Sequence, residues 1–179
     1  MPSFREHERL RLRISGLTGS PVWRSLGAVE NSGGFDMTSD QLRPGLRHTQ
    51  AIMVSEAMTV PAFAGVFASF GGMPPVLATA FLVGFMEWAC IEALRPHIPD
   101  HQHTLGTHVD VSHSAATPVG MTITAEVELI AIEGRRLRFR IECRDEVEII
   151  GSGFHERAIV DGEKFLARVG RKGSREGRS

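Results

Sequence analysis

The sequence has almost no net charge and few cysteines, and both shortages narrow the possible functions. Twenty Lys and Arg residues against 21 Asp and Glu residues leave a formal net charge of -1. A chain without a basic excess lacks the attraction on which nucleic-acid binding depends, so nucleic acid is not an expected partner. Cys90 and Cys143 lie far apart without CxxC or metal-site spacing. We therefore predict two buried free thiols in a reducing compartment.

Long apolar runs are also missing. The first 15 residues carry charges throughout, which is not typical of a secretory signal. The longest apolar stretch, 76–91, is shorter than the roughly 20 residues that span a bilayer, and Glu87 interrupts it. We expect a soluble cytoplasmic protein with no membrane partner.

Several motifs of catalysis and cofactor binding are absent. No phosphate-binding glycine loop follows a predicted strand, and no GxSxG elbow is present. Four histidines lie between residues 97 and 108, but their spacing matches no standard zinc pattern. We expect neither a metal nor a tightly bound cofactor.

The chain divides into three parts by composition. Residues 1–41 are predicted to be a flexible N-terminal extension, with Met1 and Met37 as two open starting points. Residues 42–170 carry the regular patterning of one domain. Residues 171–179 are basic and glycine-containing, which predicts a flexible tail.

The patterning within 42–170 predicts an α+β domain in which an antiparallel sheet curls around one helix. The residues 76–95 lack proline, end at Pro96 and are too long for a strand, which indicates a helix. Segment 61–75 is rich in glycine and proline and predicts a short helix and a lid. Strands are predicted at 48–55, 108–115, 121–131, 136–142 and 154–160, with a hairpin turn at 133–135 and a break at 151–153.

Glu87 is the one carboxylate in an otherwise apolar part of this helix, between residues 76 and 91. A helix that is apolar nearly all round is expected to be buried on most sides. A buried carboxylate costs free energy unless it is hydrogen-bonded or has a chemical role. Glu87 is either a structural bridge to another polar group or a nucleophile or general base tuned by its surroundings.

Thr79 lies near the start of the same helix, where a hydroxyl can cap the backbone or serve a reaction. The eight residues between Thr79 and Glu87 correspond to about 12 Å along a helix, so the two side chains cannot touch. If both serve one reaction centre, the simplest arrangement is a homodimer with its sites at the subunit interface.

His113 shares a predicted strand face with Val109 and Val111. It is either a hydrogen-bonded core residue or a proton carrier, since imidazole titrates near neutral pH.

Four segments together resemble the fluoroacetyl-CoA thioesterase-like family of the hot-dog superfamily. They are VLATAFLVGFMEWAC, LGTHVDVSHSAATP, EGRRLRFRIECRDEVEIIGSG and HERAIV with EKFLARV, within residues 42–172. The resemblance implies a hot-dog fold, with an antiparallel sheet wrapped around a long central helix. It also implies an acyl-CoA thioesterase with Thr79, Glu87 and His113 as catalytic residues.

The same resemblance assigns four further residues to substrate binding. Gly106 matches a glycine beside the acyl group, and Arg157 matches an arginine near the active site. Without the family, Gly106 would be interpreted as a strand-start glycine and Arg157 as an ion-pair partner. Phe70 matches a lid phenylalanine, whereas Met73 stands where the family has a second one, so fluoroacetyl-CoA specificity is not carried over.

The expected reaction is hydrolysis of a short or small substituted acyl-CoA to the free acid and CoA, with coenzyme A present only as part of the substrate. Glu87 would attack the carbonyl or activate water, His113 would move protons and Thr79 would orient its partners. Backbone N–H groups near Gly106 would hold the oxyanion. Another acyl-CoA reaction such as enoyl hydration, a non-catalytic acyl-CoA-binding module and a structural dimer without a ligand remain open.

Overall fold

The computed structural model describes residues 42–175, with side chains to residue 172. The predicted N-terminal extension, 1–41, and the last four positions, 176–179, lie outside the described residues.

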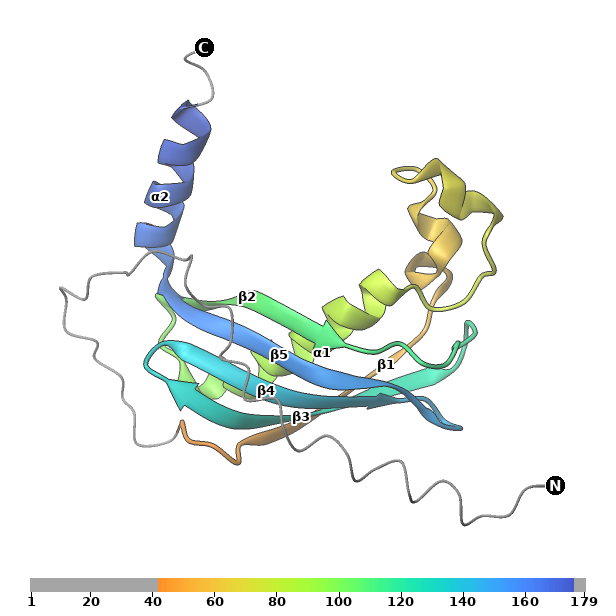
Figure 1. The fold of residues 1–179 in the computed structure, drawn as a ribbon, viewed down its shortest axis with the longest axis horizontal. Coiled ribbons are helices and arrows are strands. Elements are labelled where there is room, and N and C mark those ends of the chain that lie inside the picture. Colours follow the sequence, from red (N-terminus) through yellow and green to blue (C-terminus); the bar gives the residue numbers. More distant parts are fainter. Residues whose placement is uncertain (1–41, 176–179) are drawn as a thin grey trace, which may run out of the picture. The chain divides into compact units, whose positions relative to one another are not determined.

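Five antiparallel strands form one sheet in the order β1-β3-β4-β5-β2 (Figure 1). Their bounds are β1 Arg47–Met53, β2 Gln102–Val111, β3 Thr122–Glu133, β4 Arg136–Arg144 and β5 Ile149–Asp161. Along β4, Leu137, Phe139, Ile141 and Cys143 are buried and alternate with exposed charged residues. One face of the sheet therefore packs on the core while the other faces water.

Helix α1 (Thr79–Leu94) is the helix around which the sheet curves, and it contacts β1, β2, β3 and β4. Leu82, Met86 and Ala89 of α1 are fully or almost fully buried against the sheet. The helix starts after Val76 and Leu77 because these two residues form isolated bridges with Pro118 and Thr59. The predicted α+β arrangement, an antiparallel sheet around one long helix, is confirmed.

The hairpin turn predicted at 133–135 is also confirmed. Strand β3 ends at Glu133 and β4 begins at Arg136. Gly134 adopts φ 59°, a left-handed conformation that glycine supplies at no steric cost. Cys90 and Cys143 are free and buried, as expected from their positions.

All five strands are found within a few residues of the prediction, and two of them, β2 and β5, differ most. Strand β2 occupies 102–111 rather than 108–115, because it pairs with β5 from Gln102 opposite Asp161 to Val111 opposite Gly153. Strand β5 runs through 151–153, where a break was predicted. The glycines there allow close approach of the chains, since a Cβ at Gly151 would lie 2.4 Å from the Ser112 backbone oxygen.

The remaining elements are helical. Two short 3₁₀ helices, η2 (Val60–Phe63) and η3 (Ala68–Gly72), occupy the segment 61–75 predicted as a short helix and lid. A third, η1 (Glu56–Met58), precedes this segment, and η4 (Arg95–His97) follows α1. Helix α2 (Gly162–Arg175) extends into the segment 171–179 that was predicted to be a flexible tail. Its Lys, Arg, Leu and Ala residues favour helix and it contains no proline. Between residues 42 and 175 no helix is long and apolar enough to cross a membrane.

Candidate functional site

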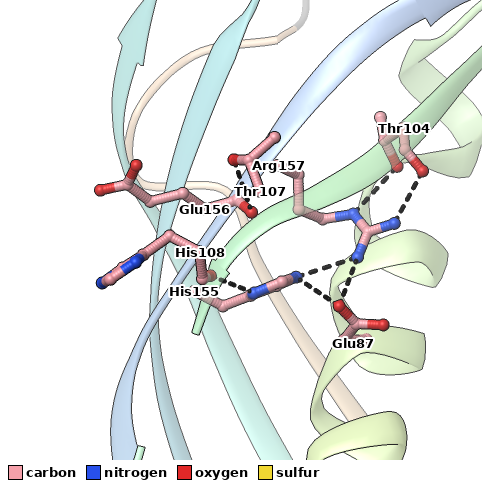
Figure 2. Close-up of polar contacts among 7 residues, drawn as sticks. All are labelled: Glu87, Thr104, Thr107, His108, His155, Glu156 and Arg157. Carbon is pink, nitrogen blue, oxygen red and sulfur yellow. Dashed lines mark hydrogen bonds and ion pairs between the residues drawn. The ribbon is translucent and has the colours of Figure 1, made fainter. Parts of the chain in front are cut away.

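Glu87 faces two basic side chains from strand β5 (Figure 2). His155 and Arg157 alternate onto the inner face of β5 and are only 1% and 2% exposed. Glu87 Oε1 lies 3.4 Å from His155 Nε2 and 3.8 Å from Arg157 Nη1. The Glu87 side chain itself is 37% exposed. The Glu87 carboxylate thus lies between the buried side chains of His155 and Arg157 and the surface of this chain.

Three hydrogen bonds hold the Arg157 guanidinium (Figure 2). Its Nε donates to Thr104 Oγ1 at 3.0 Å, and its Nη2 donates to the Thr104 carbonyl oxygen at 2.7 Å. Its Nη1 lies 2.9 Å from His155 Nε2. A buried charge is stable only when it is paired and hydrogen-bonded, and Glu87 is the carboxylate that faces this one. Arg157 therefore pairs with an acidic residue, and this residue is Glu87, the carboxylate predicted to be catalytic.

His155 is held on its other side by the backbone. Its Nδ1 lies 2.8 Å from the carbonyl oxygen of His108. Burial lowers the pKa of His155, and the positive charge of Arg157 lowers it further, while the His108 carbonyl and Glu87 act in the opposite direction. Burial has the largest effect, so His155 favours its neutral form.

Gly106 packs directly against this cluster. A Cβ at this position would lie 2.3 Å from Glu87 Oε1 and 3.1 Å from His155 Cε1. Gly106 pairs with Arg157 across β2 and β5, and the register shifts between Gly106 and His108. A side chain at this position would displace the Glu87 carboxylate from its place beside His155, so glycine leaves room for the carboxylate there. Its interpretation as a simple strand-start glycine is wrong, since β2 begins four residues earlier, at Gln102.

Thr79 and His113 form a second cluster. Thr79 Oγ1 lies 2.9 Å from His113 Nδ1, within hydrogen-bonding distance. The N-cap of α1 is Ala78, and no side chain caps this end, so the capping interpretation of Thr79 is wrong. His113 lies just after β2 rather than within a strand, because β2 ends at Val111.

His113 has one unsatisfied ring nitrogen. Burial lowers its pKa, with the Ala115 backbone acting in the opposite direction. Its Nε2 is shielded from solvent and makes no hydrogen bond to any of the residues whose side chains are described. A neutral imidazole with a free nitrogen is suited to accept or deliver a proton.

The two clusters are separate within one chain. Thr79 and Glu87 are both on α1, eight residues and about 12 Å of helical rise apart. The prediction that α1 is buried on most sides is not met by this chain alone. Gly84 is exposed, and Trp88 and Ile91 are 38% and 36% exposed. The helix has more apolar surface than the sheet of this chain covers.

The predicted lid residues lie before α1 and are exposed in this chain. Phe70 lies in η3 and Met73 follows it, and they are 36% and 50% exposed. The Phe70 ring packs beside Phe67, with ring centroids 5.3 Å apart. Phe63 of the lid segment lines an apolar pocket of about 350 Å³ on the flank of α1 that faces β1. The pocket is lined by Ile52, Met58, Phe63, Leu77, Ala80, Phe81, Gly84, Phe85, Trp88 and Ile123.

Two members of the first cluster, His155 and Thr104, were not singled out in the sequence. The signal for His155 was its alternation with Arg157 and Ile159, which places two basic residues on the apolar face of a strand. Thr104 had no comparable signal, because its role depends on the pairing of β2 with β5. No set of three or more His, Cys, Asp or Glu residues in the described part of the chain could hold a metal ion.

Comparison with known proteins places this architecture among thioesterases. A family model described as fluoroacetyl-CoA-specific thioesterase matches residues 54–163. The fluoroacetyl-CoA thioesterase of Streptantibioticus cattleyicolor is 44% identical over 133 residues, covering 74% of this chain and 96% of that protein.

Solved structures agree with this similarity. A structure of a fluoroacetyl-CoA thioesterase is 44% identical with a TM-score of 0.72, covering 74% of this chain and 98% of that one. A variant in complex with acetyl-CoA gives 44% identity and a TM-score of 0.71, covering 73% and 98%. A thioesterase superfamily member from Thermus thermophilus is 27% identical with a TM-score of 0.69, covering 76% and 97%. The predicted hot-dog fold is confirmed.

The lowered pKa values of His113 and His155 predict a stability that depends on pH. Below the ordinary pKa of 6.5, the unfolded chain binds protons that the folded chain excludes, so the free energy of unfolding falls as pH drops. Urea denaturation between about pH 7 and pH 5 measures this change above the ordinary carboxylate range. His155→Gln should flatten the dependence. An unchanged slope in this variant would show that His155 titrates normally in the folded protein.

Proposed function

The chain belongs to the fluoroacetyl-CoA-specific thioesterase family, and from that premise we propose that it hydrolyses acyl-CoA thioesters with a short or small substituted acyl group. The products are the free acid and coenzyme A. The relative's complex with acetyl-CoA supports a substrate of this class. The observation that carries the proposal is that α1 positions both a nucleophile or base, Glu87, and, through the hydrogen bond of Thr79 to His113, a proton carrier.

Glu87 is the group that we propose acts on the thioester carbonyl, directly or through a water molecule. Its Oε1 is turned toward His155 and Arg157, which leaves Oε2 for the substrate. Attack forms a tetrahedral intermediate with a negatively charged oxygen. Backbone N–H groups near Gly106, which lies against Glu87, are the proposed donors that stabilise this oxygen. The intermediate collapses by breaking the carbon–sulfur bond, and water supplies the oxygen of the acid.

His113 is the proposed proton carrier. Its Nε2 makes no hydrogen bond to the described residues, while Nδ1 is hydrogen-bonded to Thr79. The imidazole can therefore take a proton from water and give one to the leaving thiolate, with Thr79 fixing the orientation of the ring. The lowered pKa favours the neutral, proton-accepting form at neutral pH.

A homodimer would bring the two clusters into one site. The 12 Å of helical rise between Thr79 and Glu87 prevents contact in one chain, whereas a two-fold axis can set Glu87 of one protomer beside Thr79 and His113 of its partner. Two features support this arrangement. Trp88 and Ile91 leave apolar surface exposed beside Glu87, and β2, with Val109 42% exposed, is an edge strand of the sheet. Edge strands with exposed apolar residues tend to pair with another chain.

The proposed location is the cytoplasm. Both cysteines are free and buried, which is compatible with a reducing compartment.

The first prediction is loss of turnover in two variants. Glu87→Gln removes the attacking charge and His113→Ala removes the proton carrier, so each should lower kcat by at least about 100-fold. The measurement is release of free CoA, detected with a thiol reagent, from acetyl-, fluoroacetyl-, propionyl-, butyryl- and phenylacetyl-CoA. Glu156→Gln, on the outer face of β5, is the matched control. If well-folded wild type binds these esters but releases no CoA, the chain is a binding module or catalyses another acyl-CoA reaction.

The shared site gives a second prediction. When inactive Glu87→Gln and His113→Ala chains are mixed and allowed to exchange, the mixed dimer contains one site with both substitutions and one with neither. Random exchange should restore about a quarter of the wild-type activity. Sites built from a single chain would give no restoration in any mixture, and this result would refute the dimeric arrangement.

A further inference from the structure

His155 has a single protonation state that satisfies its surroundings. Arg157 Nη1 can only donate, and it lies 2.9 Å from His155 Nε2. His155 Nε2 must therefore carry a lone pair and no hydrogen. Nδ1 lies 2.8 Å from the His108 carbonyl oxygen, which can only accept, so Nδ1 carries the proton. Turning the ring over would place carbon atoms against both partners and lose both hydrogen bonds.

A charged His155 paired with Glu87 is the competing arrangement. The distance from His155 Nε2 to Glu87 Oε1 is 3.4 Å, which is long for a charge-assisted hydrogen bond, whereas 2.9 Å to Arg157 Nη1 is an ordinary hydrogen-bonding distance. A proton on Nε2 would also point one donor at another and set two buried positive charges side by side. The neutral ring is therefore the arrangement that fits the geometry.

The neutral ring completes the set of acceptors around Arg157. Thr104 supplies two acceptors, at Nε and Nη2, and His155 supplies the third, at Nη1. These three contacts fix the plane of the guanidinium and the direction of Nη1, which faces Glu87 Oε1 at 3.8 Å (Figure 2). Without the acceptor on His155, Arg157 could rotate to satisfy Nη1 with the Glu87 carboxylate itself.

Resting on the proposed function, we propose that His155 is a positioning residue. As a neutral imidazole with its proton on Nδ1, it accepts a hydrogen bond from Arg157 and keeps the guanidinium from closing on Glu87. Arg157 then stabilises the Glu87 charge from one side without binding it in a tight ion pair. The carboxylate stays available to the thioester, and Gly106 leaves room for this position.

The kinetic test compares two replacements of His155. His155→Gln offers an amide oxygen to Arg157 and should keep most of the wild-type kcat. His155→Phe fills the same space without an acceptor and should lower kcat by about 10- to 100-fold, because small displacements of a reacting group cost this much. The KM for the ester should change little in both variants. Glu156→Gln, from the neighbouring position on the opposite face, should match wild type.

Coupling to Glu87 separates positioning from a general structural effect. In a Glu87→Gln background, His155→Phe should cause little further loss, because the carboxylate it positions is already gone. An equal loss in both backgrounds, or wild-type kcat in His155→Phe, would overturn the proposal.

Nitrogen NMR of wild type tests the proposal even if His155→Phe does not fold. Among the eight histidines of the chain, the His155 signals are identified by their disappearance in His155→Gln. At neutral pH they should show a protonated Nδ1 and an unprotonated Nε2. An imidazolium or a protonated Nε2 would overturn the proposal. Failure of the proposed function would instead appear as full turnover by Glu87→Gln, independently of the His155 tautomer.

Discussion

The burial of the Arg157 charge beneath the sheet is the constraint from which most of the site follows. A guanidinium that is 2% exposed must be hydrogen-bonded and must face an anion, or its transfer from water would destabilise the fold. Thr104 and His155 supply the acceptors and Glu87 supplies the charge. Glycine at position 106 leaves room for the carboxylate, which occupies the space a side chain would need.

The separation of the two clusters along α1 is the reason for proposing a site shared by two chains. The same straight helix carries Thr79 at its first turn, hydrogen-bonded to His113, and Glu87 about 12 Å further along. Neither cluster alone holds both an attacking group and a proton carrier. The exposed apolar side chains beside Glu87 and the edge position of β2 give a physical reason for a second copy. In the proposed dimer, catalysis and assembly would depend on the same surface of α1.

The sequence was sufficient where structure depends on local pattern. The helix, the alternation along β4 and the glycine turn at 134 were predicted because each follows from residues close in the chain. The errors lie where distant segments meet. The bounds of β2 depend on its register with β5, and the glycines at 151–153 serve close approach to β2 rather than a break.

In the site, too, single residues could be predicted from the sequence, whereas contacts between distant segments could not. Glu87, Thr79 and His113 were singled out from the sequence with a structural and a catalytic interpretation each. The likeness to a known family favoured the catalytic one and supplied Gly106 and Arg157. The hydrogen bond from Thr79 to His113 spans 34 residues and that from His155 to the His108 carbonyl spans 47, so periodicity could reveal neither. The exposure of α1 could not be predicted either, because an apolar pattern does not show how much of the helix the sheet of the same chain covers.

The most direct measurement of the central claim, that the reaction needs two chains, is specific activity during dilution. Sedimentation and turnover would be followed over the same protein concentrations, with the 19.6 kDa chain as the mass of the monomer. If each site needs two chains, specific activity falls in step with the dimer fraction and monomers are inactive. Full specific activity in a population shown to be monomeric would contradict it.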